Sequence, residues 1–250
     1  MQLLTVLCLV LFSCVAGTVG VRLLLLSRRT GALPERLLGT AYLSASALGY
    51  PIMIVAAALA PSSPELGRWV HHVGSFGVQF GIACLLFFNA IVFRPGALWA
   101  TAAAILGSCV LAICFIGTFL IWGQPDFIAR ARNFGVGTIC VLGLGYAWIA
   151  IEGFHYHAMM QRRANIGLAD PVLTNRFLLW SVMGILASLS NFLCLGFLLA
   201  GRNIMTDPMP VLATSLNGVA NGILIFLIFM PPDWYLQRIA PGRQTVAAVV

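Results

Sequence analysis

Residues 97–123 read ALWATAAAILGSCVLAICFIGTFLIWG, a stretch without a single charged side chain. A helix needs about 20 consecutive apolar residues to cross the hydrocarbon core of a bilayer. The stretch exceeds that length, and it lies between Pro95 and Pro125, which are typical of breaks between helices. Residues 97–123 are therefore expected to form a membrane-spanning helix.

Six further apolar runs of similar length follow the same pattern along the chain. Hydrophobic residues make up 60% of the sequence and charged residues only 8%, against roughly 25% charged in soluble domains. Because lipid offers no hydrogen-bond partner to an open backbone, such runs must be helical. The predicted fold class is all-α: a polytopic, seven-transmembrane-helix bundle whose expected spans are 3–26, 37–60, 69–93, 97–123, 133–159, 173–200 and 208–230.

The loops between these runs are short, so residues 1–232 are expected to form one transmembrane domain. Residues 233–250 form a short tail that begins with Asp233, Trp234 and Tyr235. Tryptophan and tyrosine at this place suit the head-group layer of the membrane. The tail is too short for an enzymatic output domain, so any signalling needs a separate cytoplasmic or membrane protein partner.

The distribution of arginines predicts the orientation of the bundle. If the N-terminus lies outside, four arginines fall in outer segments, namely Arg68, Arg130, Arg132 and Arg202. Ten fall in inner segments: Arg22, Arg28, Arg29, Arg36, Arg94, Arg162, Arg163, Arg176, Arg238 and Arg243. Cytoplasmic loops carry the excess of basic residues. We therefore expect an outside N-terminus and a cytoplasmic C-terminus, in a multi-pass protein of a cell membrane, the bacterial inner membrane.

Composition argues against several cofactors and partners. All fourteen basic residues are arginine, so the lysine Schiff base that holds retinal cannot form. Haem would need histidines on two helices at one depth, whereas His71 and His72 begin the third span, far from His155 at the inner end of the fifth. No pattern of metal ligands appears, so we expect no metal and no cofactor. The net charge of +7 lies in short loops beside apolar spans, which does not indicate a nucleic-acid partner.

Neutral polar residues fall near mid-bilayer in five of the expected spans. Those in the sixth and seventh spans are spaced three or four apart, which places each pair on one helical face. Pro51 is expected to kink the second helix and to free a backbone carbonyl. Uncharged donors and acceptors suit a sugar, an alcohol or a lipid head group. The alternative is interhelical hydrogen bonding at about 0.6 kcal/mol each. The candidate ligand-binding residues are Tyr50, Gln79, Tyr146, Ser188, Asn191, Asn217 and Asn221.

A second candidate site lies toward the inner end of the fifth span. Glu152 and His155 are three residues apart, near Trp148, Tyr156 and His157. A carboxylate in a transmembrane segment is a functional hypothesis by default. The pair is therefore a candidate proton-linked site and, if the protein is an enzyme, its acid and base. The alternative is an anchor that reaches interfacial water.

Small residues and a faint internal repeat indicate how the helices are arranged. Gly77 and Gly81 stand four apart in the third span, as do Gly218 and Gly222 in the seventh, a spacing that allows close helix packing. The linkers after the first and fifth spans also share a pattern of arginines, glycine and proline. This pattern indicates three helices, one inverting helix and three more, as in some transporters.

In helix count and orientation the expected bundle is similar to rhodopsin-like receptors and to the sugar transporters called SWEETs. The rhodopsin lysine is absent, and Pro51 alone matches the four-proline gate of SWEETs, so membership of neither family is inferred. The leading hypothesis is a receptor-like or sensory protein that binds a small uncharged polar or amphipathic molecule. The alternatives are a facilitative transporter and a lipid-processing enzyme or assembly factor that uses Glu152 and His155.

Overall fold

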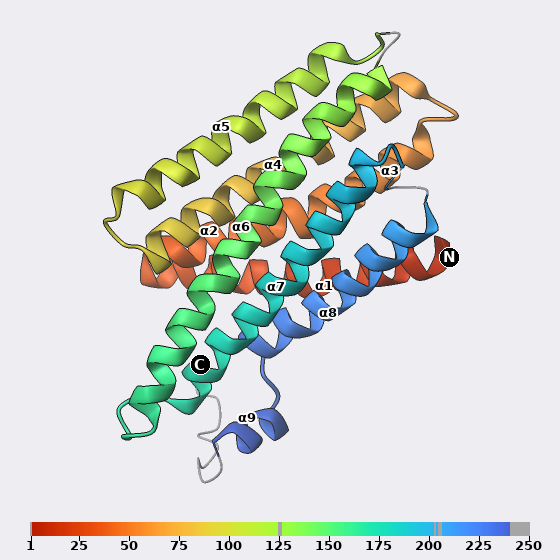
Figure 1. Cartoon of the computed structure of the whole chain (residues 1–250). Helices are drawn as coiled ribbons and strands as arrows, with labels where there is room; N and C mark the ends of the chain where they lie inside the picture. Colours follow the sequence, from red (N-terminus) through yellow and green to blue (C-terminus); the bar gives the residue numbers. More distant parts are fainter. Residues whose placement is uncertain (1, 125–126, 203, 205–206, 241–250) are drawn as a thin grey trace.

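Seven long apolar helices confirm the predicted fold class (Figure 1). The structure, a computed structural model, describes residues 2–124, 127–202, 204 and 207–240. Six of the seven are continuous helices, and the second span is built from three consecutive segments. The continuous helices are α1 (Gln2–Thr30), α4 (Pro64–Phe93), α5 (Leu98–Ile121), α6 (Phe127–Ala164), α7 (Pro171–Leu199) and α8 (Pro208–Phe229).

The second span changes its helical winding at its centre. It runs from α2 (Leu33–Ala41) through the π-helix η1 (Tyr42–Gly49) into α3 (Tyr50–Leu59). Within η1 the N–H of Tyr50 bonds to the carbonyl of Ala45, five residues earlier. In this register the carbonyl of Ser46 would need the N–H of residue 51, which is proline and has none. This register agrees with the expectation that Pro51 frees a carbonyl, and the expected kink stays a prediction.

Helix α1 supplies a replacement donor for that carbonyl. The hydroxyl of Ser13 donates a hydrogen bond to the Ser46 carbonyl oxygen at 3.0 Å. Ser46 is itself buried, so without this bond its carbonyl would lose a partner in an apolar setting. The bond ties the centre of the second span to the first.

Local sequence explains where the helices begin and end. Pro171 and Pro208 begin α7 and α8, each preceded by an aspartate that accepts a hydrogen bond from a backbone N–H of the first turn: Asp170 from Val172 at 2.9 Å, Asp207 from Met209 at 3.3 Å. This is the preferred chemistry of a helix start. Gly31 ends α1 with a φ of +72°, a conformation that favours glycine.

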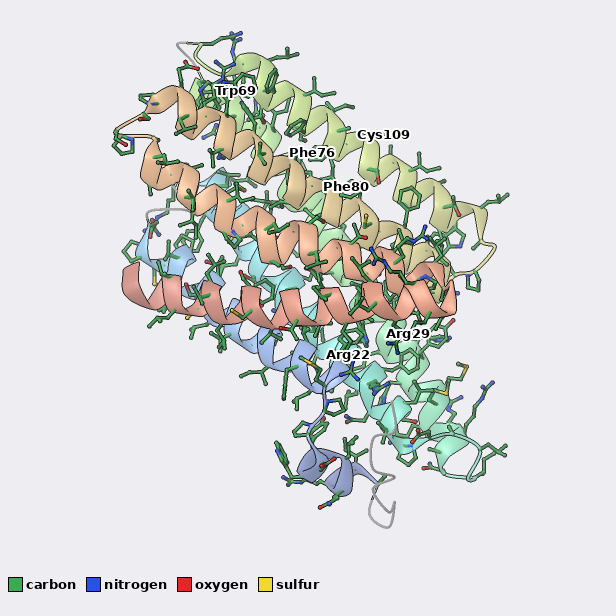
Figure 2. All side chains as sticks on the ribbon, turned by 180° about the vertical axis from the view of Figure 1, so that it is seen from behind. Arg22, Arg29, Trp69, Phe76, Phe80 and Cys109 are labelled. Carbon is green, nitrogen blue, oxygen red and sulfur yellow. The ribbon has the colours of Figure 1, made fainter. Side chains whose placement is uncertain are left out.

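The helices form a ring in which neighbours in sequence are neighbours in space. Each long helix packs against the next, and α1 closes the ring by packing against α8. Helix α4 is the most enclosed because it also contacts α6 and all three segments of the second span. Helix α5 lies at the rim, with most of its apolar side chains facing outward (Figures 1 and 2). Outward-facing here means directed away from the other helices, toward lipid or water.

The predicted close packing through glycine holds for the third span. A Cβ on Gly77 would lie 2.9 Å from the Ser44 carbonyl oxygen of η1, and one on Gly81 would lie 2.9 Å from the Ala41 oxygen. In the seventh span, Gly222 packs at ordinary distance against Phe12, and no atom lies within 4 Å of a Cβ built on Gly218. Close backbone approach therefore occurs between α4 and the second span.

One end of the bundle carries most of the arginines and is here called the arginine-rich end. There α1, α4, α6 and α8 finish, and α2, α5 and α7 begin. Figure 2 shows Arg22 and Arg29 toward this end and Trp69 toward the other. This grouping matches the predicted one, while the side of the membrane that it faces stays a prediction.

Helices α6 and α7 run past the other long helices at the arginine-rich end (Figure 1). Helix α6 has 38 residues, many more than a bilayer requires. The short helix α9 (Asp233–Ile239) packs beside this projection, where the amide of Asn175 donates to the Tyr235 hydroxyl at 2.8 Å. The rest of the predicted tail, residues 241–250, lies outside the described residues.

Candidate functional site

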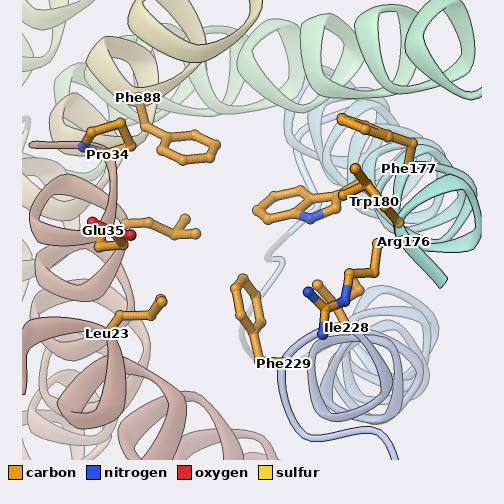
Figure 3. Close-up of a pocket in the computed structure, with 11 residues that line it drawn as sticks. Leu23, Pro34, Glu35, Phe88, Arg176, Phe177, Trp180, Ile228 and Phe229 are labelled. Atoms are coloured by element: carbon orange, nitrogen blue, oxygen red, sulfur yellow. The ribbon is translucent and has the colours of Figure 1, made fainter. Parts of the chain in front are cut away.

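A partly open cavity of about 210 Å³ lies between helices at the arginine-rich end (Figure 3). Five elements contribute to its walls: α1, α2, α4, α7 and α8. Nine of the lining side chains are apolar or aromatic and two are ionisable. The lining residues are Leu23, Pro34, Glu35, Leu38, Phe88, Leu173, Arg176, Phe177, Trp180, Ile228 and Phe229.

The two ionisable residues occupy opposite walls of this cavity, Glu35 on α2 and Arg176 on α7 (Figure 3). Among the described side chains no ion pair joins them, although both are half-buried. The Nε atom of Arg176 is buried and has no hydrogen-bond partner among the described residues. One carboxylate oxygen of Glu35 accepts a hydrogen bond from the Thr30 hydroxyl at 3.2 Å. The cavity therefore separates a carboxylate from an incompletely satisfied guanidinium.

Helix starts place both charged groups. Glu35 stands in the first turn of α2, directly after Pro34, and Arg176 stands in the second turn of α7, which starts at Pro171. Because α2 and α7 both begin at the arginine-rich end, two residues from distant parts of the sequence line the same cavity.

Aromatic rings form much of the remaining wall. Trp180 stacks on Phe88 with ring centroids 5.7 Å apart and meets Phe229 edge-on at 5.9 Å. Behind them Phe177 stacks on Tyr156 at 5.4 Å, which connects the cavity to helix α6. The cavity thus has a packed, apolar wall and charged side chains at two positions, the composition typical of small-molecule sites.

Glu152 belongs to a separate cluster beside this wall. Its Oε1 accepts a hydrogen bond from Nε of Arg94 at 2.6 Å and another from the Trp148 indole at 3.3 Å. The carboxylate is 3% exposed, and its Oε2 has no partner among the described residues. Arg94 also lies over the ring of Trp99 at 5.9 Å. The hydrogen bond and the negative charge of Glu152 raise the pKa of the Arg94 guanidinium.

The structure separates Glu152 from His155. Glu152 faces inward and is held by Arg94 and Trp148, whereas His155 is exposed and packs its ring against Tyr156. His157 instead contacts the Thr174 carbonyl at 2.9 Å, which joins α6 to α7. A proton-linked or acid–base role for Glu152 and His155 stays a prediction, and no described contact between the two residues supports it.

The seven predicted ligand-binding residues do not line the described cavity. Several bond to backbone instead: Ser188 donates to the Gly143 carbonyl at 3.1 Å, Asn191 to its own helix at Ala187 at 2.7 Å, and Asn221 to Asn217 at 2.8 Å. The Ser188 bond joins α7 to α6, which is the interhelical hydrogen bonding that the sequence offers as the alternative to ligand binding. A ligand-binding role for this polar set stays a prediction.

Part of the polar set nevertheless converges. Tyr146 of α6 packs against the buried apolar cluster that contains Tyr42 of the second span. Buried oxygens without a described partner occur on Tyr42, Gln79 and Asn221. Such atoms are the usual places for an ordered water or a ligand group.

Sequence reasoning missed four residues of this region: Glu35, Tyr42, Asn89 and Arg176. Asn89 is fully buried and donates to the Gly145 carbonyl at 3.2 Å, so it joins α4 to α6. Its place within the third span was a signal that could have identified it. Glu35 and Arg176 stand at span ends, where charged residues are ordinary, so the sequence held no signal for them.

The opposite end of the bundle holds an aromatic cluster around a histidine. The buried ring of His72 contacts Phe119 at 4.8 Å and Trp122 at 5.2 Å, and His71 contacts Trp122 at 5.5 Å. Within the described ranges no group of three histidines, cysteines or carboxylates is suitably placed for a metal ion. The expected lack of metal and cofactor stays a prediction.

The fold defines an integral, multi-pass membrane protein, and a mostly apolar cavity with two ionisable residues lies at its arginine-rich end. Comparison of the chain with models of protein families, with curated proteins and with solved structures gives no match.

Proposed function

We propose that this membrane protein is receptor-like and holds an amphipathic molecule in the cavity between α1, α2, α4, α7 and α8. The observation that carries the proposal is a mostly apolar cavity lined by Arg176, whose guanidinium Nε is buried and has no hydrogen-bond partner among the described residues. An apolar ligand would leave that nitrogen unsatisfied, which costs free energy in an apolar setting. A polar ligand would leave the aromatic wall without a partner.

The size of the cavity supports a ligand that is only partly enclosed. At about 210 Å³ the cavity is smaller than the roughly 300–1,000 Å³ of sites that enclose a drug-sized molecule. A head group with the first part of its chain fits such a volume, and the remaining chain extends into lipid through the open side. This proposal keeps the amphipathic ligand expected from sequence but moves its site from mid-bilayer to the arginine-rich end.

The experiment uses purified full-length protein and counts co-purified amphipathic molecules by native mass spectrometry. Leu173→Trp places a bulky ring in the cavity wall, and Leu106→Trp, on the outward face of α5, is the matched control. We expect wild type and the control to retain ligand and Leu173→Trp to lose it at unchanged melting temperature. Equal retention by all three proteins contradicts the proposal.

A facilitative transporter is the second candidate, and the π-helical segment η1 favours it. Interrupted helices commonly line the substrate sites of transporters near the bilayer midplane. Under this proposal Tyr50 and Tyr146 contact the solute, and the helices follow the three-plus-one-plus-three pattern. Proteoliposomes should then exchange labelled solute, whereas a receptor would bind without flux.

A further inference from the structure

We infer that the cavity recognises a zwitterionic head group, with the cationic group at Glu35 and the anionic group at Arg176. This inference rests on the proposed function, because it names the chemical class of the amphipathic ligand. It is carried by the two opposite charges, which stand on facing walls of one cavity without pairing (Figure 3).

Charge balance is the first argument. Glu35 and Arg176 are the two ionisable residues that line the cavity, so their formal charges cancel. A purely anionic head group would satisfy Arg176 but would meet the negative charge of Glu35 across a small volume. A neutral head group would leave both charges half-buried without a counter-ion, which is unfavourable. A zwitterion of matching polarity satisfies both walls.

The aromatic wall is the second argument. Trp180 and Phe229 meet edge-on at 5.9 Å, and Trp180 stacks on Phe88, so three rings border the space between the charged residues. Aromatic faces attract ammonium groups, and the attraction strengthens where water is displaced. The same rings offer apolar contact to the first carbons of an acyl chain. Rings beside a carboxylate therefore suit an ammonium group attached to a lipid.

The third argument concerns the unpartnered atom of Arg176. A guanidinium is matched in shape to phosphate and carboxylate, which it binds through parallel hydrogen bonds. Its Nε is buried and without a partner among the described residues, and the side chain lines the cavity without an ion pair to a described carboxylate. Phosphate next to an ammonium group, as in phosphatidylethanolamine, presents the required pair of charges.

The test measures retention of defined lipids by the full-length protein, with native mass spectrometry as the readout. The probes are phosphatidylethanolamine, the anionic phosphatidylglycerol and uncharged diacylglycerol, all with the same acyl chains. We expect wild type to prefer phosphatidylethanolamine by about tenfold or more, the order of effect when one desolvated charge loses its partner. Soluble glycerophosphoethanolamine, added as a competitor, distinguishes the two sources of a zwitterion. If the competitor displaces bound phosphatidylethanolamine, the natural ligand is a free solute. If the lipid stays bound, the natural ligand is a membrane lipid.

Three variants make the test specific. Glu35→Gln should abolish the preference over phosphatidylglycerol, and Arg176→Gln should weaken retention of both phospholipids. Arg28→Gln, an exposed arginine outside the cavity, should change neither. Melting temperatures check that every variant folds. If Leu173→Trp retains as much co-purified ligand as wild type does, the proposed function fails, and if none of the three lipids is retained, the zwitterion inference is overturned. If all three lipids bind equally, or if Glu35→Gln keeps the wild-type preference, the proposed function stands and the zwitterion inference is overturned.

Discussion

Single polar side chains at the arginine-rich end take their partners from distant parts of the chain. Glu152 is paired with Arg94, 58 residues away, and Tyr156 donates to the Phe93 carbonyl at 3.1 Å, 63 residues away. Both bonds join the last turn of α4 and its end to α6. These two residues thus fix where α4 stops relative to its neighbour.

The burial of the two partners predicts unequal effects of their removal. Arg94→Gln leaves a Glu152 side chain that is 4% exposed without its counter-ion, whereas Glu152→Gln leaves an arginine whose side chain is 44% exposed and can be hydrated. An uncompensated buried charge is the more costly state. Arg94→Gln should therefore lower the melting temperature more than Glu152→Gln does.

The double variant Arg94→Gln/Glu152→Gln serves as the control for that pair. Because it removes both charges, its melting temperature should recover above that of Arg94→Gln alone. Purely additive losses in the double variant would mean that the two side chains act independently, contrary to the ion pair at 2.6 Å.

At the scale of single elements, the second span depends on a bond supplied by α1. Ser13→Ala removes the donor to the Ser46 carbonyl and should cost about 0.6 kcal/mol, the typical value for such bonds in membranes. In a Pro51→Ala background residue 51 regains an N–H that can bond within the helix. Ser13→Ala should then cost less, and a double-mutant cycle of unfolding free energies measures the difference. An identical cost in both backgrounds would contradict the proline explanation.

The surroundings of two glycines, Gly81 of α4 and Gly218 of α8, predict opposite outcomes of their substitution. Gly81→Ala would bring a methyl group within 2.9 Å of the Ala41 oxygen, and overpacking of this kind costs about 1–3 kcal/mol. Gly218→Ala meets no atom within 4 Å and replaces a poor helix former, so stability should hold or rise. Thermal melting of both variants compares them, and a stable Gly81→Ala protein would refute the close approach.

At the scale of the whole molecule, orientation in the membrane is the next prediction. The arginine bias places the C-terminus in the cytoplasm, and Gln244→Cys provides a thiol in the tail, outside the described residues. An impermeant maleimide should label this thiol only after lysis of the cells. The native cysteines fall in membrane-spanning helices, and wild type measures their background. Labelling of intact cells would show that the C-terminus lies outside, opposite to the predicted orientation.

The sequence predicted the helices well because their limits are local. The seventh span was expected at 208–230 and is Pro208–Phe229, since a proline and its preceding aspartate start that helix. The fifth was expected at 133–159, but α6 continues to Ala164 because a helix can leave the bilayer without any break in its pattern. An apolar run identifies the part of a helix that lies inside lipid, but it does not show how far the helix continues outside.

The candidate site was much less predictable, for a physical reason. Glu35 and Arg176 are 141 positions apart, and each is an ordinary charged residue beside a span. Only the closed ring of helices brings them to one cavity. The midplane residues, in contrast, are easy to find in the sequence because they are polar in apolar surroundings. Several of them form hydrogen bonds to backbone carbonyls.

The most direct test of the account is a cryo-electron microscopy structure of the full-length protein in lipid nanodiscs that contain phosphatidylethanolamine. We expect head-group density between the walls that carry Glu35 and Arg176, in contact with the Trp180 ring, with an acyl chain leading out to lipid. A cavity without density, or one closed by a direct ion pair between Glu35 and Arg176, would contradict it.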